Sequence, residues 1–191
     1  KTEGPIFRWG TFLAALGLMT IGAVTMWIAH PPVYQTNDDV SIRLALEGRT
    51  APGEPGTGFT VLTHAALGWP VASMYRLLPT VPWWDLVVAG MLIVGIAVVV
   101  AIGWEILGRD WLPRAMSVGA LLVVAVPLLV SFQFTVGATL GGGAAVLLAV
   151  VEAGRANDPR RGVLVMAMLV LLCALLVRTL GAAAGVVAAG L

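Results

Sequence analysis

The acidic pair Asp38 and Asp39, in the stretch HPPVYQTNDDVSIR (residues 30–43), is the part of this sequence best suited to chemistry. A carboxylate can accept a proton from an acceptor hydroxyl. Two neighbouring carboxylates can also hold a divalent cation such as Mg²⁺ or Mn²⁺, which would neutralise a phosphate leaving group. A structural role is open to the same residues, because Asn37 is a good helix N-cap and carboxylates stabilise the first turn of a helix.

Basic side chains accompany this pair along the chain. Arg43 and Arg76 are candidates to stabilise the pair or to bind a phosphate, and Arg178 is a third phosphate-binding candidate. Arg178 has an alternative interpretation, since an arginine at a membrane boundary often extends toward the headgroups. His64 is a candidate general acid or metal ligand, with a packed interfacial histidine as the alternative.

The composition places these residues in a membrane protein. The chain is 59% hydrophobic and 11% charged, whereas a soluble domain carries about 25% charged residues. Its mean hydropathy is +0.96. The net charge of +1 gives no reason to expect a nucleic-acid partner. Because Cys173 is the single cysteine, an intrachain disulfide is excluded.

The apolar runs predict a polytopic all-α protein. A spanning helix needs about 20 mostly apolar residues, and the segment between Arg114 and Glu152 has no charged residue. A single helix of that length would reach about 55 Å, so we expect it to fold back near Pro127–Gln133. Gly141–Gly143 would then serve close helix packing. We expect five spans, at about 11–30, 84–107, 114–130, 133–151 and 162–178, and a sixth, partial helix at 179–191. A signal peptide is the alternative for the first run.

The basic residues predict the orientation of these spans in the plasma (inner) membrane. With a cytoplasmic N-terminus, the cytoplasmic side carries Lys1, Arg8, Arg109, Arg114, Arg155, Arg160 and Arg161. The loop 31–83 is then external and carries Arg43, Arg49 and Arg76. Within it we expect a short helix opening at the acidic pair. A second helix, 59–78, is expected to be broken at Gly68–Pro70 and to lie along the membrane surface. Trp83 and Trp84 would anchor the next span at the interface.

Three stretches resemble the N-terminal part of integral-membrane glycosyltransferases of the GT-C fold, which use polyprenyl-phosphate sugars. One is NDD (residues 37–39), at the position of the acidic pair in the external loop of that family. The others are MYRLLPTVPWWDLVV (residues 74–88), which leads into a span, and FQFTVGATLGGGAAVLLAV (residues 132–150), which resembles a span with a polar start. The resemblance rests on the order of these elements along nearly the whole chain.

The resemblance implies transfer of a hexose or pentose from a polyprenyl-phosphate-linked sugar to an acceptor at the outer membrane surface. Asp38 would be the catalytic carboxylate, or the activator linked to a divalent cation, and Asp39 its neighbour. Family members have many more spans. We therefore expect the chain to be part of a longer protein or a shortened relative that assists other membrane subunits.

Rival functions follow from other readings of the same residues. The main alternative is a non-catalytic membrane subunit of a larger assembly, in which the acidic pair caps a helix. A bis-histidine haem site is disfavoured because His30 and His64 lie outside the expected spans. A transporter is disfavoured because no charged residue falls at the middle of the first five spans.

Overall fold

The chain folds into a bundle of helices. The computed structural model describes residues 7–31, 33–34, 37–49, 56–58, 60, 63–108, 110–154 and 159–190, the side chains of 34, 37, 120–125, 131 and 132 excepted. The elements are α1 (Trp9–Ala29), β1 (Val33–Tyr34), α2 (Asn37–Glu47), α3 (Ala65–Leu77), α4 (Trp83–Ile106), α5 (Trp111–Val130), β2 (Ser131–Phe132), α6 (Phe134–Ala153), α7 (Arg161–Val177) and α8 (Thr179–Gly190). Apart from one two-residue parallel bridge between β1 and β2, the regular structure described is helical.

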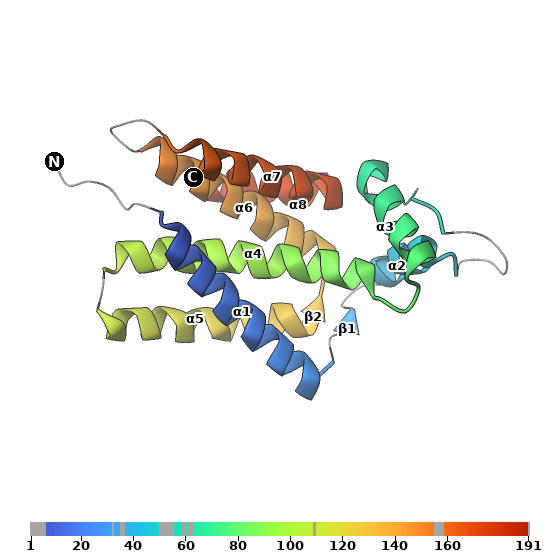
Figure 1. Ribbon diagram of the computed structural model, residues 1–191, viewed down its shortest axis with the longest axis horizontal. Helices are drawn as coiled ribbons and strands as arrows, with labels where there is room; N and C mark the ends of the chain where they lie inside the picture. Colours follow the sequence, from blue (N-terminus) through green and yellow to red (C-terminus); the bar gives the residue numbers. More distant parts are fainter. Residues whose placement is uncertain are drawn as a thin grey trace.

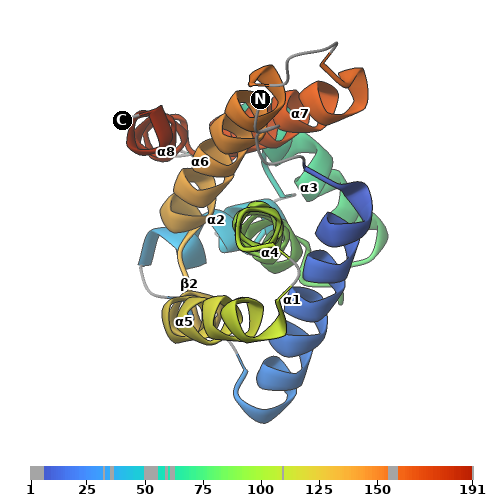
Figure 2. The same cartoon turned by 90° about the vertical axis from the view of Figure 1, so that its left-hand side faces the viewer.

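Helix α4 forms the centre of the bundle. It is apolar on all sides, so burial of its whole circumference is the favourable arrangement, and Val88, Leu92 and Val98 are fully buried. Figure 2, viewed along the bundle, shows α1, α5 and α6 around it. Trp84 is fully buried as well and lies near the ring of Phe134, with ring centroids 6.4 Å apart and the ring planes tilted by 50°. The prediction that Trp84 is an interfacial anchor is therefore wrong, because the residue packs into the bundle.

The long helices run back and forth between the two ends of the bundle, α1 obliquely to α4, whereas α2 and α3 lie across one end (Figures 1 and 2). Figure 1 shows the start of α1 and the α4–α5 turn at the opposite end. We call the end that carries α2 and α3 the α2–α3 end. This arrangement gathers the candidate functional residues of the long loop on one side of the bundle.

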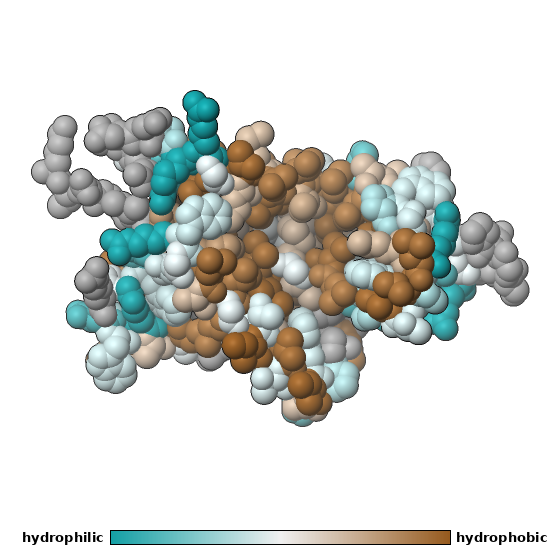
Figure 3. Space-filling model, in the orientation of Figure 1, coloured by the Kyte–Doolittle hydropathy of each residue, from teal (hydrophilic) through white to brown (hydrophobic). Residues whose placement is uncertain are grey.

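The surface of the bundle is that of a membrane protein. Helices α1, α4 and α6 are long and apolar enough to cross a membrane, and α7 and α8 are apolar but shorter, with 17 and 12 residues. In Figure 3 apolar side chains cover the middle of the visible face, and hydrophilic ones lie near both ends. Large exposed apolar side chains include Ile21 and Ile28 of α1 and Met168 and Leu169 of α7.

Each apolar run predicted from the sequence contains a helix. The turn expected near Pro127–Gln133 lies between α5 and α6, and Pro127 falls in the last turn of α5. The partial helix expected at 179–191 is α8. In the long loop, α2 begins at Asn37 as expected, although the side chain of Asn37 lies outside the described residues.

Helix α3 differs from its prediction. It begins at Ala65 rather than 59, because His64 serves as its N-cap and its Nδ1 accepts a hydrogen bond from the backbone N–H of Ala66 (3.1 Å). Of residues 59–63, only Thr60 and Thr63 lie within the described residues. The helix also continues through Pro70, where a break was expected. A proline inside a helix removes one backbone hydrogen bond, and the burial of Val71, Ala72 and Tyr75 on the following turns holds the helix together.

Helices α6 and α8 approach each other through glycines. A Cβ added to Gly142 would overlap the carbonyl oxygen of Ala182, and a Cβ added to Gly185 would overlap that of Thr139. Such small residues let two helix backbones come close inside a membrane, where van der Waals contact is the main source of helix association. The expected packing role of Gly141–Gly143 is thereby confirmed.

An ion pair closes the bundle at the end opposite α2 and α3. Glu152 is fully buried and accepts hydrogen bonds from Arg160, whose guanidinium also donates to the backbone carbonyl of Phe7. Arg160 therefore links the start of α7 both to the end of α6 and to the chain just before α1. A buried carboxylate needs such partners, because removing a charge from water without them is costly.

Candidate functional site

The two members of the acidic pair have different surroundings. Asp39 is fully buried, and its Oδ1 accepts a hydrogen bond of 3.1 Å from the backbone N–H of Phe134, the first residue of α6. Asp38, one position earlier in the first turn of α2, is exposed. The pair is therefore divided into one carboxylate held inside the fold and one that faces outward.

A short parallel bridge explains how residues 95 positions apart in the sequence meet. Val33 of β1 is paired with Ser131 of β2, and Tyr34 with Phe132, so the chain entering α2 lies beside the chain entering α6. On the side of α1, the indole N–H of Trp27 donates to the carbonyl oxygen of Leu129 near the end of α5 (2.7 Å). These bonds fix the start of α2 against the α5–α6 turn.

Asp39 supplies a cap that α6 does not make for itself. The first N–H groups of a helix have no partner inside the helix, and the side chain of Gln133 at the N-cap position makes no capping bond. A carboxylate at this point satisfies a free N–H and meets the positive end of the helix dipole. The pair was expected to cap the helix that it opens, whereas the hydrogen bond that Asp39 accepts from Phe134 caps the start of α6.

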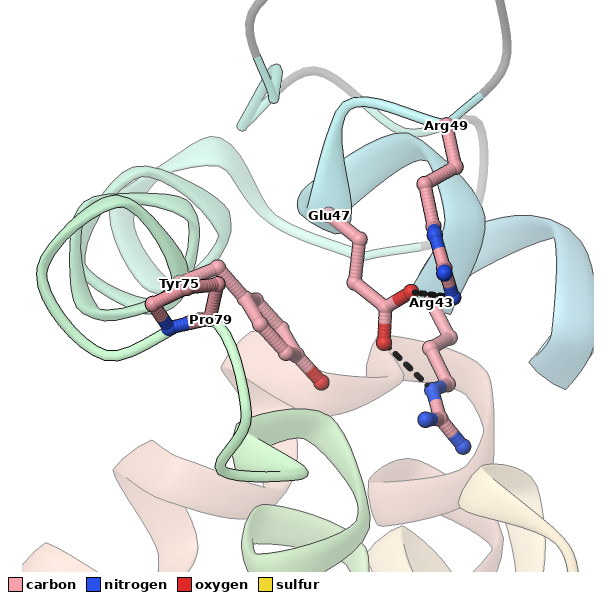
Figure 4. Close-up of a pocket in the computed structure, with 5 residues that line it drawn as sticks. All are labelled: Arg43, Glu47, Arg49, Tyr75 and Pro79. Carbon is pink, nitrogen blue, oxygen red and sulfur yellow. Dashed lines mark hydrogen bonds and ion pairs between the residues drawn. The ribbon is translucent and has the colours of Figure 1, made fainter.

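A polar pocket lies at the other end of α2. It has a volume of about 170 Å³ and is lined by Arg43, Glu47, Arg49, Tyr75 and Pro79, which we call the arginine pocket (Figure 4). Glu47 Oε1 accepts a hydrogen bond from Arg43 Nε at 2.6 Å, and Glu47 Oε2 accepts one from Arg49 Nη1 at 3.2 Å. Arg43 Nη1 also donates to Asp85 Oδ2 of α4, at 3.2 Å.

Tyr75 forms the wall of this pocket from α3. Its hydroxyl oxygen accepts a hydrogen bond of 2.9 Å from the backbone N–H of Trp84. Burial of the side chain raises the pKa of the Tyr75 hydroxyl above its usual value of 10.0. The hydroxyl therefore stays protonated at neutral pH, and its proton remains available for a hydrogen bond to another acceptor.

The arginine pocket and Asp38 lie on different flanks of α2. Arg43 lies five positions after Asp38, which is a rotation of about 140° around the helix axis. Ile42 and Leu46, both buried, occupy the face between them. A ligand that touches both Asp38 and the pocket would therefore have to pass around the N-terminal turns of α2.

The other predicted site residues are dispersed over the α2–α3 end. Arg76 donates to the carbonyl oxygen of Gly56 (2.8 Å) and lies over the ring of Trp69. Arg178 connects α7 to α8, and its guanidinium carbon lies 5.3 Å from the centre of the Phe134 ring. Its Nε is buried without a hydrogen-bond partner among the described residues. His64 is an N-cap, as described above. Of the three arginines predicted to bind phosphate, Arg43 lines the arginine pocket, whereas Arg76 and Arg178 are not among its lining residues.

Glu47, Arg49 and Tyr75 were missed as site residues by the sequence analysis. The spacing of Arg43 and Glu47, four residues apart on one helix, is a signal that predicts their ion pair. Tyr75 lies in the stretch 74–88, which resembles GT-C glycosyltransferases, yet no local sequence pattern predicts that Tyr75 packs beside α2. Its position depends on the crosswise packing of α3, which has no local sequence signature.

A divalent cation remains a prediction. Within the described ranges no group of three or more histidine, cysteine, aspartate or glutamate side chains is arranged to hold a metal ion. One Asp39 oxygen is already engaged by Phe134, which leaves Asp38 as the accessible carboxylate of the pair. Mg²⁺ bound through one or two carboxylates together with a substrate phosphate would suit such a position.

Comparisons of the chain with protein-family models, with curated proteins and with solved structures find no match.

Proposed function

We propose that this chain is a membrane glycosyltransferase of the GT-C type, which transfers a sugar from a polyprenyl-phosphate donor at the α2–α3 end. The observation that supports the proposal most is the division of the acidic pair. A buried, hydrogen-bonded Asp39 fixes the first turn of α2, and the exposed Asp38 is presented from that fixed turn. A catalytic carboxylate has to be held in position by its surroundings in this manner.

The residues have distinct roles in the proposed reaction. Asp38 accepts the proton of the acceptor hydroxyl while the acceptor oxygen forms a bond to the anomeric carbon of the sugar. The bond from that carbon to the phosphate oxygen breaks, and the polyprenyl phosphate leaves with the electron pair. Asp39 is a positioning residue, because it acts through the backbone of α6. A divalent cation near Asp38 would lower the cost of the leaving phosphate charge.

The proposal includes the topology of five spans with a cytoplasmic N-terminus in the plasma membrane. Helices α5 and α7 would cross in addition to α1, α4 and α6, which have the required length and composition. The back-and-forth course of these helices in Figure 1 is consistent with that count. In this topology α2 and α3 lie at the outer surface, where a lipid-linked sugar and a polar acceptor meet.

The proposal is tested by measuring sugar transfer with the whole chain. Membranes containing the protein are incubated with polyprenyl-phosphate-linked radiolabelled hexoses and pentoses, and incorporation of label into an acceptor is compared with membranes lacking it. Protein-dependent transfer from a polyprenyl-phosphate donor is expected. A folded protein that transfers none of these sugars would instead favour the non-catalytic subunit, in which Asp39 caps α6 and Asp38 has no chemical task.

A further inference from the structure

The arginine pocket contains two cations that share one carboxylate. Figure 4 shows Glu47 between Arg43 and Arg49, with a dashed contact to each. The side chain of Glu47 is 9% exposed, whereas those of Arg43 and Arg49 are 34% and 69% exposed. A carboxylate bridging two guanidinium groups occupies the place that a tetrahedral oxyanion would take, since both present acceptor oxygens to the same N–H groups.

Most of the hydrogen-bonding capacity left over in the pocket consists of donors, although Oδ1 of Asp85 is a buried acceptor without a partner among the described residues. Each oxygen of Glu47 already accepts a bond, and Asp85 binds Arg43 from the side of α4. Each guanidinium has five N–H donors, of which Arg43 uses two and Arg49 one in these bonds. The Tyr75 hydroxyl adds a further donor, since its oxygen accepts from Trp84 and its proton remains available. A group rich in acceptor oxygens and lacking donors is the ligand that this set fits.

We propose that the arginine pocket binds a phosphate group, and that Glu47 is an internal competitor which holds Arg49 until the phosphate takes its place. The charges support an exchange of this kind. Glu47 and Asp85 balance Arg43 and Arg49, so the unliganded cluster is neutral and stable. When a phosphate enters, Arg49 turns from Glu47 to the ligand, which costs little because the Arg49 side chain is exposed and the largely buried Glu47 keeps its shorter bond to Arg43.

The surroundings fit a phosphate carried by a lipid. Pro79 lines the pocket, and the two residues before it, Leu77 and Leu78, are exposed apolar side chains at the end of α3. An acyl or prenyl chain could lie against them while its headgroup enters the pocket. The role of the phosphate as part of a sugar donor rests on the proposed function, but its binding does not, so binding and transfer can be tested separately.

Binding is measured with the purified chain in a neutral detergent. Two probes are titrated, dodecyl phosphate as a lipid phosphate monoester and inorganic phosphate as the free anion, and affinity is read from the shift of the thermal unfolding temperature. The variants are Arg49→Gln, which removes the more exposed guanidinium, and Glu47→Gln, which removes the competitor. Arg114→Gln is the matched control, since Arg114 lies at the end of the bundle opposite α2 and α3 and its guanidinium bonds to Gly108 and Trp104.

Arg49→Gln is expected to weaken dodecyl phosphate binding about tenfold, the usual effect of losing a charge-assisted hydrogen bond. Glu47→Gln is expected to strengthen it about two- to fivefold, and Arg114→Gln to leave it unchanged. Equal affinity for the two probes would assign the site to free phosphate, and preference for dodecyl phosphate to a lipid. Absence of binding by the wild-type chain, or equal losses in Arg49→Gln and Arg114→Gln, would overturn the inference. If the wild-type chain binds dodecyl phosphate but transfers no sugar, the proposed function is refuted and the inference about the arginine pocket stands.

Discussion

Asp39 of α2 and Phe134 of α6 are joined by a hydrogen bond from the backbone N–H of Phe134 to the carboxylate of Asp39. This bond connects the loop that carries the candidate chemistry to the helical bundle. It also separates the roles within the acidic pair, because the buried residue is committed to the fold and the exposed one is available. The residue that looks like a supporting neighbour in the sequence is therefore the structural one.

Asp39→Ala is expected to destabilise the protein by about 1–3 kcal/mol, because the buried N–H of Phe134 loses its acceptor. Unfolding in detergent, followed by circular dichroism, measures the effect. Asp38→Ala serves as the control, and an exposed carboxylate in a first helical turn contributes only about 0.3–1 kcal/mol. Equal losses in the two variants would show that the contact between Asp39 and Phe134 contributes nothing special.

Gly185→Val is expected to destabilise the packing of α8 against α6, because the Cβ of the introduced valine would overlap the carbonyl oxygen of Thr139. Overpacking of this kind costs about 1–3 kcal/mol. Thermal unfolding and resistance to proteolysis near the C-terminus are the measurements. Gly190→Val in the same helix is the control, because a Cβ there meets no atom within 4 Å. A Gly185→Val protein as stable as the Gly190→Val protein would contradict the close approach.

The proposed orientation predicts which positions are reached from outside the cell. In a chain whose native cysteine is removed by Cys173→Ala, cysteine is introduced at Ser73 of α3 and at Ala153 at the end of α6, both exposed. A membrane-impermeant thiol reagent is expected to label Ser73→Cys in intact cells and Ala153→Cys only after permeabilisation. The reverse labelling pattern would show that the orientation is the opposite of the one proposed. Labelling of both cysteine variants in intact cells would show that the two positions do not lie on opposite sides of the membrane.

Tyr75 makes the stability dependent on pH in the alkaline range. Its pKa is raised by burial, so the folded state prefers the protonated hydroxyl. Its contribution is fully present below the unfolded pKa of about 10 and is lost as pH rises toward the higher folded value. The difference in unfolding free energy between wild type and Tyr75→Phe should therefore fall above pH of about 10. A difference that is constant from neutral to alkaline pH would contradict burial of this hydroxyl.

The helices of the bundle could be predicted because a run of apolar residues long enough to cross a membrane is a strong local signal. The connections between them could not. The β1–β2 bridge brings together four residues whose types carry no pairing signal. The burial of Trp84 depends on the packing of α6 beside α4, whereas the sequence shows only an aromatic pair at the start of an apolar run.

The candidate site was predicted in part for the same reason. Asp38 and Asp39 stand out from the sequence because charged residues are rare in this chain. Which of them is buried depends on Phe134, far away along the sequence, and no local pattern encodes that contact. The arginine pocket likewise needs Tyr75 to arrive from α3, whose start is set by His64 and whose course continues through Pro70.

The central claim is that Asp38 carries the chemistry and Asp39 holds it in place, and sugar transfer by Asp38→Asn tests this most directly. Transfer from a polyprenyl-phosphate donor is measured per amount of folded protein, with Asp110→Asn, exposed at the opposite end of the bundle, as the control. Asparagine has nearly the shape of aspartate and gives up only the charge in the first turn, which contributes about 0.3–1 kcal/mol. A folded protein is therefore expected together with a loss of turnover of about 10²-fold or more. Full transfer activity in a stable Asp38→Asn protein would contradict the account and leave the pair with a structural role alone.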